Sequence, residues 1–132
     1  PPTLWMWFVM PRVIDFEIPA DDIERITTFY QTVFGWKVEK WKGPVDHWFL
    51  ITGDDAEPGI NGSFAQREEF PEGVTVNVIG VEDIDKYIKL IKTNNGTIIG
   101  EKMTIPGVGY YVYFKDTEGN LMGMMQYDST VK

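Results

Sequence analysis

One pattern decides how this chain folds: VIDFEIPADDIERITTFYQTVFGWKV (residues 13–38) returns as VTVNVIGVEDIDKYIKLIKTNNGTII (residues 74–99). A constant offset of 61 residues (83 − 22) aligns the two stretches without a gap. The residues paired by this offset include Asp22 with Asp83, Gly35 with Gly96 and, further along, Gly62 with Gly123. A long match at one fixed offset indicates two copies of a supersecondary unit. We therefore expect two repeats, over about residues 13–64 and 74–126.

Each copy predicts a strand, a helix and three further strands. The first six residues of each copy are rich in β-branched and alternating residues, which favours a strand. Apolar residues then recur at helical spacing, after Asp21 or Asp22 as the cap in the first copy and Asp83 in the second. Gly35 and Gly96 stand where a left-handed residue ends a helix. The β-biased segments that follow are residues 36–41, 46–53 and 59–65, and residues 97–103, 109–115 and 120–126.

Length and composition indicate a single α+β domain. The chain has 132 residues, of which 43% are hydrophobic, enough for one ordinary core. We assign residues 10–132 to this domain and treat residues 1–9 as a separate leader. The apolar run LWMWFVM (residues 4–10) is far shorter than a membrane span. It is either an extended reading frame or an added strand or dimer contact, and the sequence leaves both open.

Charge and cysteine content exclude several classes of function. The net charge of −8 disfavours binding to nucleic acid and to anionic membrane surfaces. The same negative field favours a cationic ligand. The absence of cysteine excludes disulfides, thiolate metal sites and cysteine nucleophiles, and we expect a cytoplasmic location.

Two phrases carry a family resemblance: FYQTVFGW (residues 29–36) and FKDTEGN (residues 114–120). Together with the tandem β-α-β-β-β pattern, they make the chain resemble the vicinal oxygen chelate superfamily of glyoxalase I, bleomycin-resistance and extradiol-dioxygenase proteins. The resemblance implies that each unit curls its mixed sheet into half of a cup and that two units close a pocket. It also implies a homodimer.

The resemblance places four metal-ligand positions on the first and fourth strands of the two units. Metal-dependent relatives carry His or Gln on the first strand and Glu on the fourth. Here these positions fall on Asp15, Gly62, Val76 and Gly123. Only Asp15 offers a ligand atom, and one carboxylate does not hold a transition-metal ion, so we expect no metal and no other cofactor. His47, the only histidine, falls on a third strand, where packing and a functional role both remain open.

Strand alternation places Asp15 and Glu17 on one face, with Ile14, Phe16 and Ile18 on the other. The apolar residues should pack under the helix, so the two carboxylates should face the cup. There they would raise each other's pKa and serve as an acid–base pair, or they would make ordinary hydrogen bonds at the rim.

The remaining candidates would line the same cup. Gly62 and Gly123 would leave open floor for a ligand, or mark a bulge in a curved sheet. Aromatic and methionine side chains would supply walls. The candidate ligand-binding residues are Asp15, Glu17, Trp48, Gly62, Val76, Tyr111, Gly123 and Met125.

Three functions remain open at this level. The leading hypothesis is a metal-independent protein that binds an aromatic or cationic small molecule. The alternative is an enzyme of the lyase, isomerase or dioxygenase type, with Asp15 or Glu17 as acid or base, or with a metal site that the sequence does not reveal. The third is an interaction module without a ligand.

Overall fold

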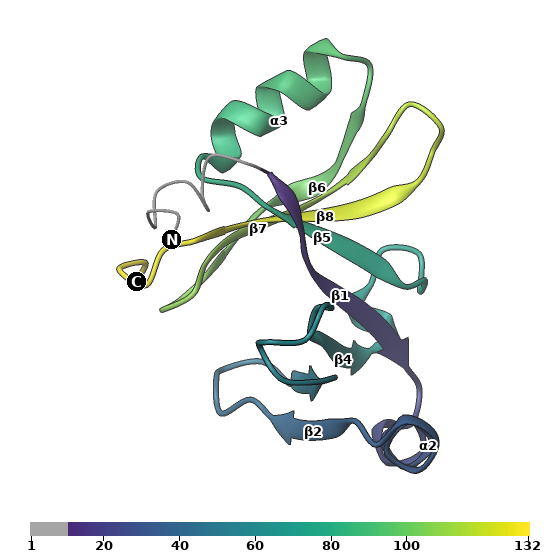
Figure 1. Cartoon of the computed structure of the whole chain (residues 1–132). Coiled ribbons are helices and arrows are strands. Elements are labelled where there is room, and N and C mark those ends of the chain that lie inside the picture. Colours follow the sequence, from purple (N-terminus) through teal and green to yellow (C-terminus); the bar gives the residue numbers. More distant parts are fainter. Residues whose placement is uncertain (1–10) are drawn as a thin grey trace. The chain divides into compact units, whose positions relative to one another are not determined.

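The computed structural model describes residues 11–132, so the expected leader lies outside the described residues. The described chain forms two compact units, residues 14–76 and residues 77–132 with residues 11–13. These units match the two repeats to within a few residues, and we count the strand of residues 12–20 with the first unit and the strand of residues 76–80 with the second. Each unit contains one α-helix together with a set of strands (Figure 1). The tandem β-α-β-β-β prediction is therefore confirmed.

The first unit contains the elements β1 (Arg12–Ala20), α2 (Ile23–Phe34), β2 (Lys37–Lys40), β3 (Trp48–Ile51), β4 (Gly62–Gln66) and the short 3-10 helix η1 (Arg67–Glu69). Its strands are ordered β2-β3-β4-β1, and β1 runs parallel to β4 while the other pairs are antiparallel. The sheet is therefore mixed.

The second unit repeats this arrangement with longer strands. It contains β5 (Val76–Gly80), α3 (Ile84–Thr93), β6 (Thr97–Ile105), β7 (Gly109–Lys115) and β8 (Leu121–Tyr127). The strand order is β5-β8-β7-β6, with β5 parallel to β8 and the remaining pairs antiparallel. Within residues 11–132, neither helix is long and apolar enough to cross a membrane.

Both helices begin at the predicted aspartate. The Asp22 carboxylate accepts a hydrogen bond from the backbone N–H of Arg25 at 3.0 Å, and Asp83 accepts one from Lys86 at 3.2 Å. Each bond satisfies a donor that the first helical turn leaves unpaired. Asp21, the other predicted cap, instead accepts a hydrogen bond from the Arg67 side chain at 2.9 Å.

The two helices end differently, which the sequence alignment did not predict. Gly35 follows α2 in the left-handed conformation with φ of 74°, as expected. In the second unit the left-handed residue is Asn95, with φ of 70°, and not Gly96. A Cβ at Gly96 would lie 2.6 Å from the Ile91 side chain, so this glycine serves a close packing contact. The α3 helix ends at Thr93, which is two residues earlier in the repeat than the end of α2 at Phe34 (93 − 61 = 32).

A shift of one residue also separates the last strands of the two repeats. Glu17 on β1 is the register partner of Ser63 on β4, 46 residues on (63 − 17). Val78 on β5 is the partner of Gly123 on β8, only 45 residues on (123 − 78). Ser63, and not Gly62, is thus the structural counterpart of Gly123, and the gap-free offset of 61 is wrong for the last strand.

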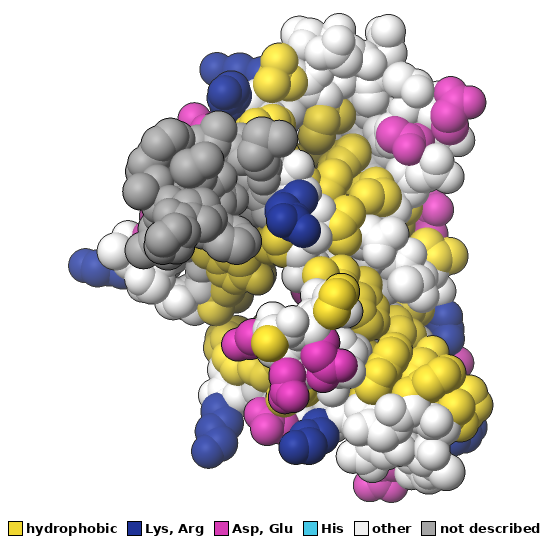
Figure 2. All heavy atoms as spheres, in the orientation of Figure 1, with side chains coloured by type: hydrophobic (Ala, Val, Ile, Leu, Met, Phe, Trp, Pro, Cys, Tyr) yellow, Lys and Arg dark blue, Asp and Glu magenta, His cyan; other side chains and the backbone are white. Residues whose placement is uncertain are grey.

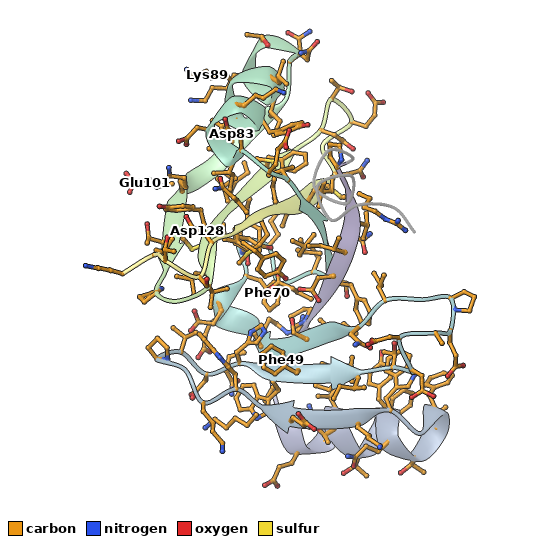
Figure 3. All side chains as sticks on the ribbon, turned by 60° about the vertical axis from the view of Figure 1, so that its left-hand side comes forward. Phe49, Phe70, Asp83, Lys89, Glu101 and Asp128 are labelled. Atoms are coloured by element: carbon orange, nitrogen blue, oxygen red, sulfur yellow. The ribbon has the colours of Figure 1, made fainter. Side chains whose placement is uncertain are left out.

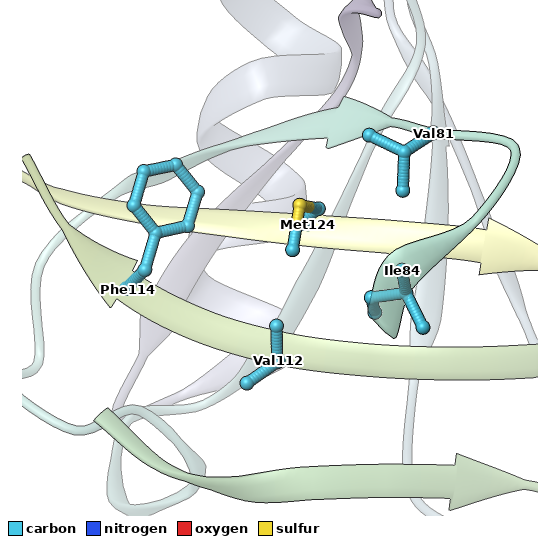
Figure 4. Close-up of a cluster of buried hydrophobic side chains, with 5 residues drawn as sticks. All are labelled: Val81, Ile84, Val112, Phe114 and Met124. Atoms are coloured by element: carbon cyan, nitrogen blue, oxygen red, sulfur yellow. The ribbon is translucent and has the colours of Figure 1, made fainter. Parts of the chain in front are cut away.

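The core of the second unit lies between α3 and its sheet. Figure 4 shows five buried apolar side chains from the strands, the helix and the loop before it, namely Val81, Ile84, Val112, Phe114 and Met124. Burial of each large apolar side chain contributes about 1.5–3 kcal/mol. This cluster packs one face of the second unit's strands against α3. The opposite face of these strands does not contact the helix.

The core of the first unit is made of larger rings. Phe64 and Leu50 are fully buried, and the Tyr30 ring of α2 lies 5.7 Å from the Phe64 ring. The outer side of α2 remains open, since Phe29 and Phe34 are 54% and 60% exposed. Figure 2 shows apolar side chains at the surface beside this helix.

The β7–β8 turn has a purely structural explanation. The Asp116 carboxylate accepts hydrogen bonds from the backbone N–H groups of Glu118 and Asn120, at 2.9 and 3.0 Å, and from the Asn120 side chain at 3.0 Å. The Asn120 side chain is the main cause that lowers the pKa of Asp116, and the backbone bonds add to it. Gly119 supplies a left-handed residue with φ of 79°. These contacts explain the predicted family phrase without any ligand.

Candidate functional site

The strands of the first unit present one face that α2 covers and one face that is directed away from α2. The Phe16 ring lies on the helix side, 6.3 Å from the Trp36 ring, which in turn stacks on Tyr30 of α2. Because side chains alternate along a strand, Asp15 and Glu17 lie on the other face. Within this unit the structure therefore places both carboxylates on the side that the sequence predicts.

Strand register adds two residues to this face. Ser63 on β4 is paired with Glu17 on β1 and with Phe49 on β3. Register partners in adjacent strands point to the same side of a sheet. We call the residues Asp15, Glu17, Ser63 and Phe49 the acidic face of the first unit. Figure 3 labels Phe49 on this sheet.

Asp15 has an unusual environment on the acidic face. Burial, and to a lesser extent the neighbouring charge of Glu17, raise the pKa of its carboxyl to about 7, against the lowering effect of a hydrogen bond from the Phe16 backbone. Among residues 11–132, no Lys or Arg forms a salt bridge with Asp15. The carboxyl therefore exchanges its proton near neutral pH.

Ser63 carries a buried hydroxyl next to this carboxylate pair. The residue is only 1% exposed, and its Oγ has no hydrogen-bond partner among the described residues. Buried hydroxyls are nearly always hydrogen-bonded, so an unpaired one requires an explanation. Its position opposite Glu17 makes it a candidate contact for a bound molecule.

Aromatic rings extend the acidic face from Phe49. The His47 ring meets Phe49 edge to face at 5.5 Å, and the Trp41 ring meets His47 in the same way at 6.1 Å. Burial lowers the pKa of His47, so its ring is neutral at physiological pH. His47 directly precedes β3 and shares the side of Phe49, two residues on.

Two predicted pocket residues of the first unit lie on the helix side instead. Trp48 is the register partner of Phe64, which contacts α2, and Lys40 Nζ lies 5.6 Å from the Trp48 ring. Gly62 leaves no open floor, because a Cβ there would lie 2.5 Å from the Phe16 ring. The one-residue shift between the repeats explains the error at Gly62 and the omission of Ser63. The side of Trp48 and Phe49 depends on the pairing of β3 with β4, for which the sequence carries no signal.

The corresponding face of the second unit is apolar. Val78, Tyr111 and Met125 form a buried cluster on the side of the sheet that faces away from α3. Gly123 lies on the same side as the register partner of Val78, and alternation adds Val76. A Cβ at Gly123 would collide with the Tyr111 side chain, so this glycine makes room for a tyrosine and leaves no floor open. We call Val76, Val78, Tyr111, Gly123 and Met125 the apolar face of the second unit.

The donor atoms of the chain do not fit a metal centre of the family type. Within residues 11–132, no three His, Asp or Glu side chains gather closely enough to hold one ion. Of the four positions that the resemblance assigns to ligands, Asp15 carries a carboxylate, whereas Gly62, Val76 and Gly123 carry no donor side chain. Transition-metal sites normally use three or four protein ligands.

Comparisons with known proteins agree on the family. The model of the Glyoxalase/Bleomycin resistance protein/Dioxygenase superfamily matches residues 12–124. A glyoxylase-like domain-containing protein of Didymella fabae is 29% identical over 113 residues, which cover 83% of this chain and 88% of the relative.

Solved structures share the fold. A hypothetical protein from Bacillus halodurans matches with a TM-score of 0.67 and 17% identity, over 92% of this chain and 98% of the other. A serine-to-threonine variant of Streptomyces coelicolor methylmalonyl-CoA epimerase, in complex with 2-nitronate-propionyl-CoA, matches with a TM-score of 0.66 and 16% identity. That match covers 92% of this chain and 97% of the epimerase.

Proposed function

Because the chain belongs to the Glyoxalase/Bleomycin resistance protein/Dioxygenase superfamily, we propose that its acidic face binds a small molecule without a metal ion. The bound molecule carries a cationic or hydrogen-bond-donating group, for which Asp15 and Glu17 are the acceptors. The observation that carries this proposal is a carboxyl pair on the face away from the helix, of which Asp15 has no salt bridge to a Lys or Arg of residues 11–132.

The carboxyl pair of Asp15 and Glu17 is costly to keep ionised in a buried place. Burying the Asp15 carboxylate beside the charge of Glu17 is unfavourable, and the raised pKa of Asp15 is the expression of that cost. A cationic ligand would remove it by pairing with both groups. The net charge of −8 acts in the same direction, since it attracts cations at long range.

Other charged groups on this side of the sheet are few among the described residues. By register, Lys37 and Glu39 of β2 share the side of Phe49, and both are exposed. His47 also lies on this side and stays neutral above its lowered pKa. Between pH 6.5 and 8, Asp15 is thus the main group expected to change its charge.

The test is a titration with benzylamine and its neutral analogue benzyl alcohol, followed by amide shifts of the full chain in NMR spectra. We expect benzylamine to shift the amides of residues 15–17 and 63 saturably, with benzyl alcohol binding more weakly. Since Asp15 must ionise, affinity for benzylamine should rise about fourfold from pH 6.5 to pH 8.

Two variants distinguish specific binding at Asp15 from a general attraction of cations to the negatively charged protein. Asp15→Asn should abolish both the binding and its pH dependence, whereas Asp55→Asn, which removes the same charge from an exposed loop, should leave both unchanged. Equal effects of the two substitutions would show that only net charge matters and would reject the proposal.

A second function is favoured by the same carboxyl. A group whose pKa lies at about 7 gives and takes protons efficiently at neutral pH, so Asp15 is suited to act as a general base. Among the proteins of this fold is methylmalonyl-CoA epimerase, whose name describes the inversion of a carbon centre. Proton removal from an acidic carbon next to a carbonyl group is a reaction that Asp15 could support, with Glu17 as its neighbour.

Deuterium exchange tests this second function. Protein in D₂O would be mixed with β-dicarbonyl acids and acyl thioesters, and loss of the carbon-bound proton followed by ¹H NMR. Catalysed exchange that is lost in Asp15→Asn and unaffected by a chelator would support a metal-free enzyme. Exchange at the background rate with every compound would leave binding as the function.

A further inference from the structure

We propose that the ligand of the acidic face is an aromatic amine or amidine that bridges three strands. Its cationic group is bound by Asp15 and Glu17 on β1, its linking segment meets the Ser63 hydroxyl on β4, and its ring lies on Phe49 of β3. This inference rests on the proposed function, because it assigns the ligand class of the same face.

The register of the sheet sets the spacing of the three contacts. Ser63 is the partner of both Glu17 and Phe49, so these three side chains form one row across β1, β4 and β3. Neighbouring strands lie about 4.8 Å apart, which puts the Glu17 and Phe49 backbones about 10 Å apart. A ligand that reaches both ends of the row must therefore be longer than a benzylamine.

Ser63 supplies the polar contact at the centre of the row. Its Oγ is buried and lacks a hydrogen-bond partner among residues 11–132. A hydroxyl both donates and accepts, so it suits an ether, hydroxyl or amide in the linking segment. Because the atom is buried, a ligand that reaches it has to displace the side chains that cover it.

Phe49 supplies the apolar end of the row. It is 43% exposed, whereas the next residue on the strand, Leu50, is fully buried. His47 and Trp41 support the exposed ring by edge-to-face contacts at 5.5 and 6.1 Å. A flat ligand ring gains both apolar burial and a favourable ring contact there, and the neutral His47 ring does not repel its charge.

Two amines that differ by a ring test the apolar end. Isothermal titration calorimetry at pH 8 would compare n-butylamine with 4-phenylbutylamine on the full chain. We expect the phenyl compound to bind about tenfold more tightly. Phe49→Ala should remove most of this gain, measured as the ratio of the two affinities in the same variant, and Phe49→Leu takes its place if the alanine variant does not fold.

A matched control is available on the other side of the same unit. Phe34 of α2 is also an exposed phenylalanine, at 60%, and lies on the helix. Phe34→Ala should leave the gain from the phenyl ring intact. An equal loss in both variants, or a gain that survives Phe49→Ala, would overturn the proposal.

The central contact is tested by an ether that replaces one methylene. 2-(Benzyloxy)ethylamine has the same length as 4-phenylbutylamine and adds an acceptor for the Ser63 hydroxyl. We expect it to bind about three- to tenfold more tightly than the all-carbon compound, corrected for their difference in amine pKa. This advantage should vanish in Ser63→Ala, and its persistence there would remove Ser63 from the site.

The outcomes separate the two proposals. Binding of n-butylamine that depends on Asp15, without any gain from the ring, would overturn the aromatic ligand class and leave the proposed function standing. Failure of all the amines to bind would overturn both.

Discussion

The two repeats use the same backbone pattern for opposite surfaces. On the sheet face away from the helix, the first unit carries Asp15 and Glu17 on its first strand, whereas the second carries Val76 and Val78 at the same places in the repeat. The first pair includes a carboxyl whose pKa is raised to about 7. In the second pair, Val76 is fully buried and Val78 is 2% exposed.

The helix-side faces of the two repeats are alike. Phe64 and Leu50 are fully buried in the first unit, as is Val112 in the second, where Met124 is 2% exposed. Each helix has to cover an apolar sheet face, so the fold dictates apolar residues there. The opposite face is free of that requirement, and its residues therefore carry the information about function.

Placing a carboxylate on the apolar face should be severely destabilising. We expect Val78→Asp to cost roughly 3–5 kcal/mol, because the charge would be buried against Tyr111 and Met125. Urea unfolding would measure the change. Val74→Asp is the control, since Val74 is 46% exposed and should tolerate the charge. Similar small losses in both variants would show that the apolar face is open to solvent.

Removing the carboxylate from the acidic face should stabilise the protein, and more so at high pH. In the unfolded chain Asp15 titrates near 3.8, and in the folded chain near 7, so folding binds a proton between these values. Stability therefore falls as pH rises from about 4 to about 7. The Asp15→Asn variant does not lose stability in this way. We expect its free energy of unfolding, relative to that of the parent, to increase by about 2–4 kcal/mol between pH 4.5 and pH 8.

An aspartate of the second repeat provides the reverse control. Hydrogen bonds lower the pKa of Asp116, so its ionised form stabilises the folded state above about pH 4. Asp116→Asn should therefore be less stable than the parent by a similar amount at pH 4.5 and at pH 8, because both values lie above the unfolded pKa of 3.8. Urea unfolding of both variants at the two pH values gives the comparison, and a pH-independent effect of Asp15→Asn would contradict the raised pKa.

Two neighbouring residues on β4 should respond in opposite ways. Gly62→Ala forces its Cβ to within 2.5 Å of the Phe16 ring and should cost about 1–3 kcal/mol. Ser63→Ala removes an unpaired buried hydroxyl and should be neutral or stabilising by up to about 1 kcal/mol. Thermal unfolding of the pair would check which residue faces the helix. A harmless Gly62→Ala would mean that β4 is rotated relative to this register.

Substitutions at the C-terminal ends of the two helices should give the smallest changes in stability. Asn95 has φ of 70°, a conformation that glycine adopts more easily, so Asn95→Gly should stabilise by a few tenths of a kcal/mol. Gly35→Ala should cost about 1 kcal/mol for the same reason. Thermal unfolding with Gly96→Ala as the third variant completes the set. If Gly96→Ala is harmless, the close contact with Ile91 is not a constraint.

Local patterns were sufficient to predict much of the fold. Asp22 and Asp83 cap their helices as expected, and every predicted strand is present. Alternation also assigned Asp15 and Glu17 to the side on which the structure has them, because both lie within one strand, Arg12–Ala20. These features depend on residues close in sequence, whose chemistry is visible directly.

The candidate site was predicted only in part, because a single residue changes the register. The alignment of Gly35 with Gly96 predicted that Gly96 would be the left-handed residue after the second helix. In the structure Asn95 has this conformation. The last strand, β4, is displaced by one position relative to β8, and such a displacement exchanges the two faces. Gly62 was therefore predicted where Ser63 lies, and the buried, unpaired Ser63 hydroxyl had no sequence signal at all.

By itself, the sequence determined the two β-α-β-β-β repeats, their helix starts and the acidic pair on the first strand. Periodicity and capping are local, so they can be read from neighbouring residues. Only the tertiary structure decided that Ser63 and Phe49 join Glu17, because strand pairing joins backbones 46 residues apart (63 − 17). It also decided that burial brings the pKa of Asp15 to about 7, since the solvation of a carboxyl depends on atoms from distant segments.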